Sequence, residues 1–225
     1  MNNQKNIIVI GGGAAGMIAA IAAAKEGCAV SLYEKNEKLG KKIFITGKGR
    51  CNVTNAGDMD ELFGAVITNK KFMFSSFYGF TNEDMMQFLE DAGLHLKIER
   101  GKRVFPVSDH SSDVIAALQR GLRKENVDIY FNTTVKKILI EDGIVTGVRL
   151  ASGDTVKADK VVVATGGMSY QATGSTGDGY DFARKAGHKV TKLTPALVPF
   201  EIKEDYCKQL MGLSLRNVAV TMTAD

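Results

Sequence analysis

The hexapeptide Gly11-Gly12-Gly13-Ala14-Ala15-Gly16 has a glycine spacing suited to binding a phosphate group through the backbone. In such a turn the first glycine permits a tight bend, the second lets the backbone approach a pyrophosphate, and the third lets a helix pack closely against a strand. A helix beginning there adds unpaired N–H groups and the positive end of its dipole. Glu34 follows at the end of the next predicted strand, where a carboxylate would accept hydrogen bonds from ribose hydroxyls and disfavour a 2′-phosphate.

This chemistry needs a strand before the glycines and a helix after them, and the sequence predicts both. Ile7–Ile10 is a continuous apolar run, typical of a strand buried on both faces of a parallel sheet. Ala14–Glu26 is rich in alanine and reaches Gly27 without a helix breaker, and Ala29–Tyr33 is a second strand. This context favours a dinucleotide-binding fingerprint. The alternative is a glycine turn without a ligand, with Glu34 as a solvated strand end.

Another apolar strand with a glycine turn lies far along the chain. Val161–Ala164 is predicted to be a buried strand, and Thr165-Gly166-Gly167 follows it. A simple nicotinamide dehydrogenase has no need of this element. Taken alone, the segment also fits an ordinary buried strand with a loop.

The tract from Lys42 to Asn55 places glycines among cationic and amide side chains, which suits a loop that surrounds an anionic or planar ligand. Arg50 offers a bidentate guanidinium. Cys51 is either a redox thiol or a packed loop residue, and packing is favoured because no second cysteine lies at CxxC spacing. Asp178, just before a predicted helix, is either a helix N-cap or a ligand contact.

The tract Lys42-Ile-Phe-Ile-Thr-Gly-Lys-Gly-Arg-Cys-Asn-Val-Thr-Asn55 resembles the signature of the BaiN-like and aminoacetone-oxidase-like bacterial flavoproteins. Gly101–Pro106, Tyr170–Gly179 and Gly187–Phe200 resemble the same family, in the same order. The resemblance implies a glutathione-reductase-like α/β fold, with a Rossmann-like FAD/NAD(P)-binding domain, a parallel central sheet and a β-meander. It also implies an FAD-dependent oxidoreductase that acts on a small organic substrate. Reduction of a carbon–carbon double bond and oxidation of an amine both fit, with NADH or NADPH as a candidate electron donor.

By this resemblance, Val135 meets the adenine through its backbone, and the flavin end of FAD lies near Lys42–Asn52 and the loop after Thr165. The expected cofactor contacts are Gly11, Gly13, Ala14, Ala15, Gly16, Glu34, Lys35, Lys42, Thr46, Gly49, Arg50, Cys51, Asn52, Val135, Ala164, Thr165, Gly166, Gly167, Gly177 and Asp178. No catalytic residue is assigned. The three histidines lie at no metal-ligand spacing, so no metal site is expected.

The remaining segments supply further elements around this predicted site. Gly40–Asn55 is expected to be a structured loop, and the tail from Pro195 alternates polar and apolar residues up to a strand at Asn217–Thr223. Helices are predicted at Lys71–Tyr78, Asn82–Ala92 with Thr81 as its cap, about Ser112–Lys124, and about Gly179–Ala186. Strands are predicted at His95–Glu99, Arg103–Phe105, Val127–Phe131, Val135–Glu141, Ile144–Leu150 and Thr155–Lys157.

Composition excludes several classes of protein. With 44% hydrophobic and 24% charged residues, the 225-residue chain is neither disordered nor a coiled coil. Its net charge of +4 is interleaved with acidic residues, so no nucleic-acid partner is expected. The uncharged run from Ile7 to Ala24 is broken by glycines and argues against a membrane segment. Three scattered cysteines favour a cytoplasmic location. The oligomeric state is left open.

The expected domains are residues 1–192, which bind FAD, and 193–225, the beginning of an inserted antiparallel β domain that forms part of a substrate or cap domain. Because family members are longer, the chain is expected to be an N-terminal portion of a longer enzyme. The alternative is a catalytically incomplete module that binds FAD or an ADP moiety and needs a missing segment or a partner chain. The interpretation as an NAD-only dehydrogenase has less support, since no separate catalytic domain follows the fingerprint.

Overall fold

The computed structural model describes residues 4–195, 203–215, 218, 219, 221 and 223. Two compact units are distinguished, Met1–Val190 and Thr191–Asp225. The predicted domain boundary after residue 192 stays a prediction. In the second unit the described residues include one short helix, α8 (Tyr206–Gln209). The strand predicted at 217–223 falls largely outside the described residues.

A four-stranded parallel sheet forms the centre of the first unit, which confirms the predicted α/β fold class. Its strand order is β10-β1-β2-β6. These strands are β1 (Asn6–Ile10), β2 (Ala29–Tyr33), β6 (Asp128–Tyr130) and β10 (Lys160–Val163). Because β1 lies between β2 and β10, the strand order reverses beside it. In such sheets the crevice at the carboxyl ends of the strands is where ligands bind.

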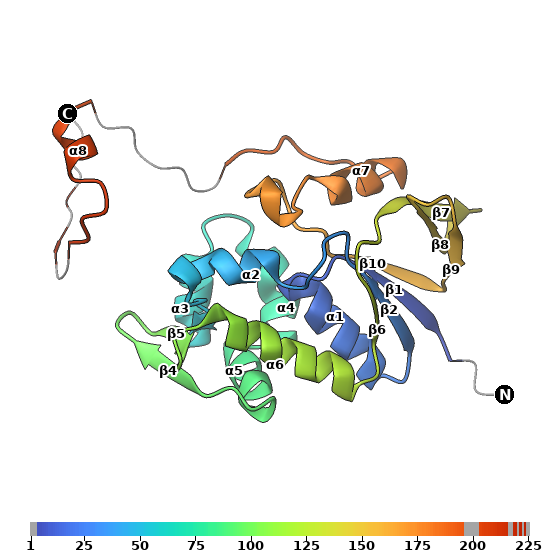
Figure 1. Ribbon diagram of the computed structural model, residues 1–225, viewed down its shortest axis with the longest axis horizontal. Coiled ribbons are helices and arrows are strands. Elements are labelled where there is room, and N and C mark those ends of the chain that lie inside the picture. The colour runs from blue at the N-terminus through green and yellow to red at the C-terminus, as the bar shows by residue number, and fades with distance from the viewer. Residues whose placement is uncertain (1–3, 196–202, 216–217, 220, 222, 224–225) are drawn as a thin grey trace. The chain divides into compact units, whose positions relative to one another are not determined.

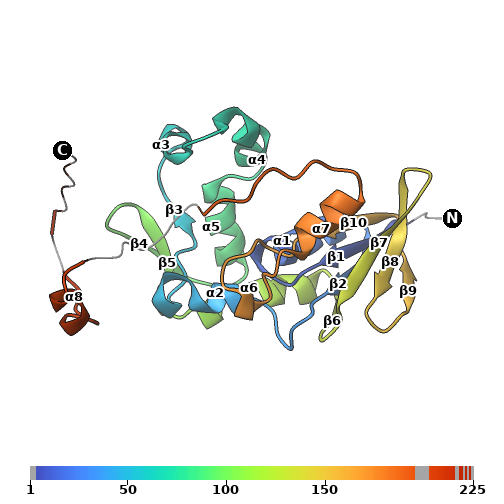
Figure 2. The same cartoon turned by 90° about the horizontal axis from the view of Figure 1, so that it is seen from above.

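Helices cover one face of this sheet, and a meander lies on the other (Figures 1 and 2). The helices α1 (Ala14–Lys25), α5 (Asn82–Asp91) and α6 (Ser111–Lys124) bury Met17, Leu89 and Leu118 with sheet residues. The meander is built from β7 (Val135–Glu141), β8 (Ile144–Leu150) and β9 (Thr155–Lys157), with the boundaries that the sequence predicts. Together with α7 (Asp178–Lys185), it packs Val148 and Phe182 against Ile8 and Ile10 of β1.

Residues 40–106 contain several short helices and a three-stranded antiparallel sheet, with more helices than predicted. The first part of the expected loop at Gly40–Asn55 is helical, and the helix predicted at Lys71–Tyr78 is divided in two. Thr81 caps α5 through a reciprocal bond with Asp84, as predicted. The elements are α2 (Lys41–Ile45), η1 (Thr46–Gly49), β3 (Thr54–Asn55), α3 (Met59–Ala65), η2 (Lys70–Met73), α4 (Phe74–Gly79), β4 (Leu96–Glu99) and β5 (Arg103–Pro106).

A further short turn, η3 (Gln171–Thr173), precedes α7. Within the described parts of the chain, none of the helices combines the length and the apolar run that crossing a bilayer requires.

The helix-covered face supplies a direct test of where the core lies. We expect Leu118→Ala to lower the free energy of unfolding by about 2–5 kcal/mol, because this side chain is 1% exposed and its loss leaves a cavity. Ile144→Ala, at a side chain that is 67% exposed, should change it by less than about 0.5 kcal/mol. Urea unfolding with an unchanged m-value measures both. Equal effects of the two substitutions would contradict this location of the core.

Candidate functional site

A cavity of about 560 Å³ opens at the carboxyl ends of β1, β2 and β10. The predicted cofactor contacts that line it are Gly11, Gly13, Ala14, Ala15, Glu34, Lys35, Lys42, Thr46, Val135, Ala164, Thr165, Gly166 and Asp178. Five segments that are distant in sequence therefore meet at one cavity. The predicted cofactor contacts that do not line the cavity are Gly16, Gly49, Arg50, Cys51, Asn52, Gly167 and Gly177.

Several lining residues were not predicted, although most adjoin a predicted one. Examples are Gly12, Asn36 and Thr134, whereas Ser175 lies two residues before the predicted Gly177. Phe182 is different, because it reaches the cavity from α7 through the packing of the meander face. Sequence spacing gives no signal for such a residue.

The glycine turn brings three backbone segments into close contact. The Gly11 N–H donates to the Tyr33 carbonyl at 2.8 Å. A Cβ on Gly16 would lie 1.8 Å from the Gly11 carbonyl oxygen, so a side chain has no room there. A Cβ on Gly13, by contrast, would have no neighbour within 4 Å. The packing of the chain itself therefore does not require glycine at position 13, and a ligand could use the open space.

The N-terminus of α1 is suited to an anion. Its N-cap is Gly13, no side chain caps it, and no acidic residue lies in its first turn. The first N–H groups of a helix have no partner within the helix, and the helix dipole favours negative charge at this end. Ala14 and Ala15, the first helical residues, line the cavity. A phosphate group could be held here by the backbone.

Glu34 is buried, which excludes the alternative that it is a solvated strand end. It is 7% exposed, and its Oε2 accepts a hydrogen bond from the Gly12 N–H at 2.7 Å. Its Oε1 accepts from the N–H and the side-chain amide of Asn36 at 2.8 and 2.6 Å. A carboxylate has about four acceptor positions, and these bonds use three. One position on Oε2 remains for a donor such as a ribose hydroxyl.

Lys42 and Thr165 both line the cavity, and the Thr165 Oγ1 is buried next to Gly179 of α7. The Lys42 Nζ donates to Ser175 Oγ at 2.6 Å. The Thr165 Oγ1 is buried and has no hydrogen-bond partner among the described residues. An unsatisfied buried hydroxyl costs about 1–3 kcal/mol, so a bound polar group at this position would be favourable.

Asp178 is the first residue of α7, and Gly177 is its N-cap, so the N-cap interpretation of Asp178 is wrong. The Asp178 carboxylate instead bonds Lys35 Nζ at 2.8 Å and Thr176 Oγ1 at 2.9 Å. Burial raises the pKa of Asp178, but these hydrogen bonds and the charge of Lys35 outweigh it and hold that pKa below its usual range. Asp178 is therefore an anion at neutral pH.

Comparison with known proteins agrees with this geometry. The family model described as the HI0933-like protein Rossmann domain matches residues 5–218. The chain belongs to the HI0933-like family. Among the relatives is the 3-dehydro-bile acid delta(4,6)-reductase of Clostridium scindens, BaiN, which is 38% identical over 89% of this chain and 48% of its own length. This confirms the resemblance to the BaiN-like flavoproteins.

A further relative and a solved structure extend the comparison. A ribosomal RNA dihydrouridine synthase of Escherichia coli is 30% identical over 97% of this chain and 53% of its own length. The structure of an open flavocytochrome c3 fumarate reductase superposes with a TM-score of 0.61 and 26% identity, over 82% of this chain and 41% of that one. The chain thus spans about half the length of the curated relatives it matches.

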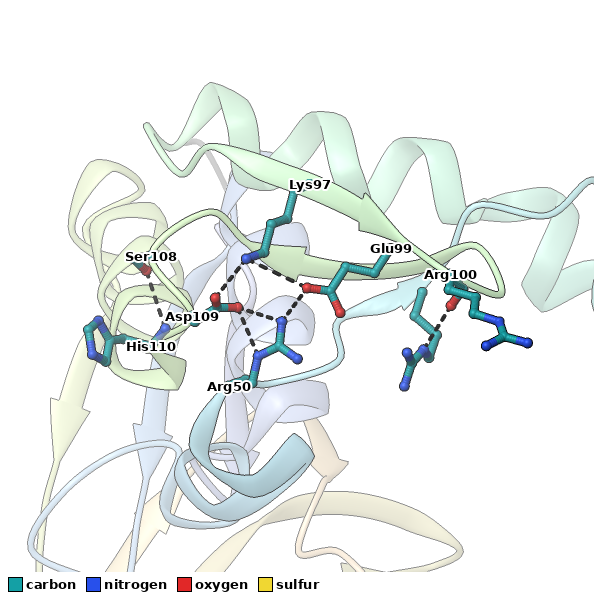
Figure 3. A network of polar contacts seen from close by, with 8 residues as sticks. Arg50, Lys97, Glu99, Arg100, Ser108, Asp109 and His110 are labelled. Carbon is teal, nitrogen blue, oxygen red and sulfur yellow. Dashed lines mark hydrogen bonds and ion pairs between the residues drawn. The ribbon is translucent and has the colours of Figure 1, made fainter. Parts of the chain in front are cut away.

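In this HI0933-like chain, Arg50 lies in an ion cluster outside the cavity lining (Figure 3). Its Nε and Nη2 donate to Asp109 Oδ1 at 2.8 and 2.6 Å, and Nη2 also bonds Glu99. Lys97 donates to the other Asp109 oxygen at 2.7 Å. The guanidinium lies 4.1 Å from the centre of the Phe105 ring. The cluster therefore joins the Thr46–Asn52 loop to β4 and β5.

Cys51 and Asn52, which follow Arg50, also make contacts within the protein. Cys51 is buried in the core cluster, and burial raises the pKa of its thiol despite a hydrogen bond with Thr46. This agrees with the packing interpretation. The Asn52 amide lies 3.2 Å from the Val104 carbonyl and 3.1 Å from that of Thr54, where its NH₂ group donates to both. Cofactor contacts by Arg50, Cys51 and Asn52 stay predictions.

No group of three or more His, Cys, Asp and Glu side chains is placed to hold a metal ion within the part of the chain that the structure describes.

The carboxylates that Arg50 pairs with make the stability of the folded protein depend on pH. The hydrogen bond from Arg50 lowers the pKa of Glu99, and those from Lys97 and Arg50 lower the pKa of Asp109. Stabilisation from depressed carboxyl pKa values is present at neutral pH and is lost as the pH falls through the folded-state values. We expect Arg50→Met to lower the Tm at neutral pH, and the deficit to narrow towards about pH 3.

A residual deficit should remain at low pH, because Arg50 also packs on Phe105. Lys102→Met is the matched control, since Lys102 lies in the turn between β4 and β5 and pairs with Glu61 of α3. Both of these side chains are about half exposed. The effect of Lys102→Met should be small at every pH. A deficit for Arg50→Met that stays constant across the pH range would show that the carboxylates do not contribute.

Proposed function

We propose that this chain is the FAD-binding portion of a bacterial oxidoreductase that acts on a small organic substrate. The observation that carries the proposal is a single cavity that joins the uncapped N-terminus of α1, the buried Glu34, and the turn after β10. A nucleotide alone needs only the first two features. The third lies on the opposite side of β1 and is what an extended flavin dinucleotide adds.

The residues present fit this cofactor. The Ala14 and Ala15 N–H groups would hold a phosphate, and the free acceptor position on Glu34 would hold a ribose hydroxyl. Lys42 would hold a negative charge near the Thr165–Gly166 turn, and Thr165 would gain the hydrogen-bond partner it lacks. When bound, the flavin supplies the redox chemistry, and the chain supplies its position and electrostatic surroundings.

We further propose a reductase rather than an amine oxidase, since the relatives compared above include a reductase and a fumarate reductase. NADH or NADPH is the proposed electron donor, and the cytoplasm the proposed location. The relatives' printed names mention substrates as different as a bile acid and ribosomal RNA. We favour a small molecule here because the charge of +4 is interleaved with acidic residues rather than gathered into basic blocks.

A nucleotide-binding module that needs further residues for turnover is the second candidate. The observation that favours it is that the chain spans about half the length of its curated relatives. An anaerobic visible spectrum separates the two candidates. A yellow protein that is bleached by NADH or NADPH supports the oxidoreductase, whereas a yellow protein that neither donor bleaches supports the module. A colourless protein that takes up no added FAD would exclude the oxidoreductase and leave only a module that binds an ADP moiety.

Glu34 provides the residue-level test of cofactor binding. We expect Glu34→Gln to weaken FAD affinity at least tenfold, because hydrogen bonds to a charged group contribute about 1.5–3 kcal/mol. A fluorescence titration with FAD measures the affinity, and circular dichroism checks that the variant is folded. Glu37→Gln is the matched control, since its side chain is 58% exposed and outside the cavity lining. Wild-type affinity in both variants would contradict the role of Glu34.

A further inference from the structure

One side of the cavity is formed by a segment that the dinucleotide fingerprint does not include. This gate segment, Thr173–Asp178, contributes Thr173, Gly174, Ser175 and Asp178 to the lining. It faces the segment Glu34–Lys42, which follows β2 and contributes lining residues of its own. The two segments are more than 130 residues apart in sequence, as the separations of the bonded pairs show.

Side-chain hydrogen bonds join the two segments across the cavity. The Lys35 Nζ donates to Thr176 Oγ1 at 2.6 Å and to Asp178 Oδ2 at 2.8 Å. The Lys42 Nζ donates to Ser175 Oγ at 2.6 Å, and the Asn36 amide donates to the Thr173 carbonyl at 3.3 Å. Lys35 makes the ionic contact, and the Lys35 and Asp178 side chains are 27% and 36% exposed. Water can therefore compete for this ion pair.

The backbone of the gate segment bonds within its own loop. Its N–H groups at positions 173, 174, 176 and 177 donate to the carbonyls of Tyr170, Gln171, Gly174 and Gly167. These bonds would persist if the segment moved away from Lys35. Gly174 has φ +100°, and a Cβ there would lie 2.6 Å from the Asn36 amide nitrogen. Only glycine lets the segment lie this close to Asn36.

We propose that the gate segment opens to admit FAD and closes again, and that the bonds from Lys35 set how often it opens. The proposal rests on the proposed function of the same cavity. Both bonded segments line the cavity, so a ligand that enters between them requires the bonds between them to open. Those bonds come from side chains, whereas the backbone bonds of the gate segment are local. Loops with this construction commonly control ligand entry and release.

The gate is also connected to the expected ribose site. Glu34 Oε1 holds the Asn36 amide, and that amide donates to the Thr173 carbonyl of the gate segment. A ligand that bonds Glu34 therefore contacts a side chain that is linked to the gate segment through Asn36. Lys35 has a positioning role in this arrangement, since it acts through the segment.

Lys35→Met in the full-length polypeptide tests the gate through the rates of FAD binding and release. Removal of the ion pair should leave the gate open more often, so both rates should rise about three- to tenfold, the range expected for a partly exposed charged bond. Although Lys35 was expected to contact the cofactor, its Nζ is bonded to Thr176 and Asp178, and the gate proposal assigns it these contacts instead. The dissociation constant should therefore stay within about twofold, because the bonds lost join protein to protein. Stopped-flow flavin fluorescence measures both rates.

Asp178→Asn removes the same ion pair from the other side but leaves the Lys35 bond to Thr176, so both rates should rise by a smaller factor. The double variant should match Lys35→Met, because Lys35→Met already removes the contact with Asp178. Lys38→Met is the matched control: it removes a lysine of the same loop that lies outside the cavity lining, over the Phe44 ring. Its rates should equal those of the wild type.

Unchanged rates in Lys35→Met and Asp178→Asn, in a protein that binds FAD, would overturn the gate alone. A faster release with an unchanged or slower binding rate would also overturn it, and would make Lys35 a direct ligand contact. A wild-type protein that takes up no FAD would overturn the proposed function, and the gate with it.

Discussion

The structure depends on a steric constraint at the point where β1, α1 and β10 meet. A Cβ on Gly11 would lie 2.5 Å from the Ala164 carbonyl oxygen, and a Cβ on Gly16 would lie 1.8 Å from the Gly11 carbonyl oxygen. Real side chains do not tolerate such distances, so three backbone segments lie in direct contact only because glycine occupies both positions. This contact brings the carboxyl end of β10 to the turn after β1. The ligand cavity forms at that junction.

The burial of Glu34 follows from the same junction. β2 pairs with β1 so that Ile10 lies beside Tyr33, which places the next residues of both strands side by side at the sheet edge. The Glu34 carboxylate then reaches the Gly12 N–H, and a Cβ on Gly12 would come within 3.1 Å of its Oε2. The tight glycine turn and the buried acid are therefore one structural feature. Their meeting requires the parallel register as well as the spacing of the motif.

The elements that could be predicted from the sequence are those whose own residues carry a hydrophobic pattern that ends at turn residues. The strands of the sheet and the meander are predicted because apolar runs or alternation end at turn residues, as at Gly143 and Gly153. α3 was missed because it buries Phe63 alone, which gives no periodic pattern, and α2 because five residues make little more than one turn. The position of Arg50 could not be foreseen, since its partner Asp109 is 59 residues away. The gate likewise depends on pairs of distant side chains.

The charges around the cavity distinguish a position for the ligand's anionic part. Lys35 bonds Asp178 and Lys41 bonds Glu37, so both lysines have carboxylate partners. Lys42 bonds the neutral hydroxyl of Ser175, which leaves its positive charge unbalanced by that bond. The uncapped N-terminus of α1 adds a second positive field on the same cavity. Negative charge is therefore best accommodated between α1 and Lys42, at the junction that the glycine contacts create. The charge of Lys35 is instead paired with Asp178 of the gate segment.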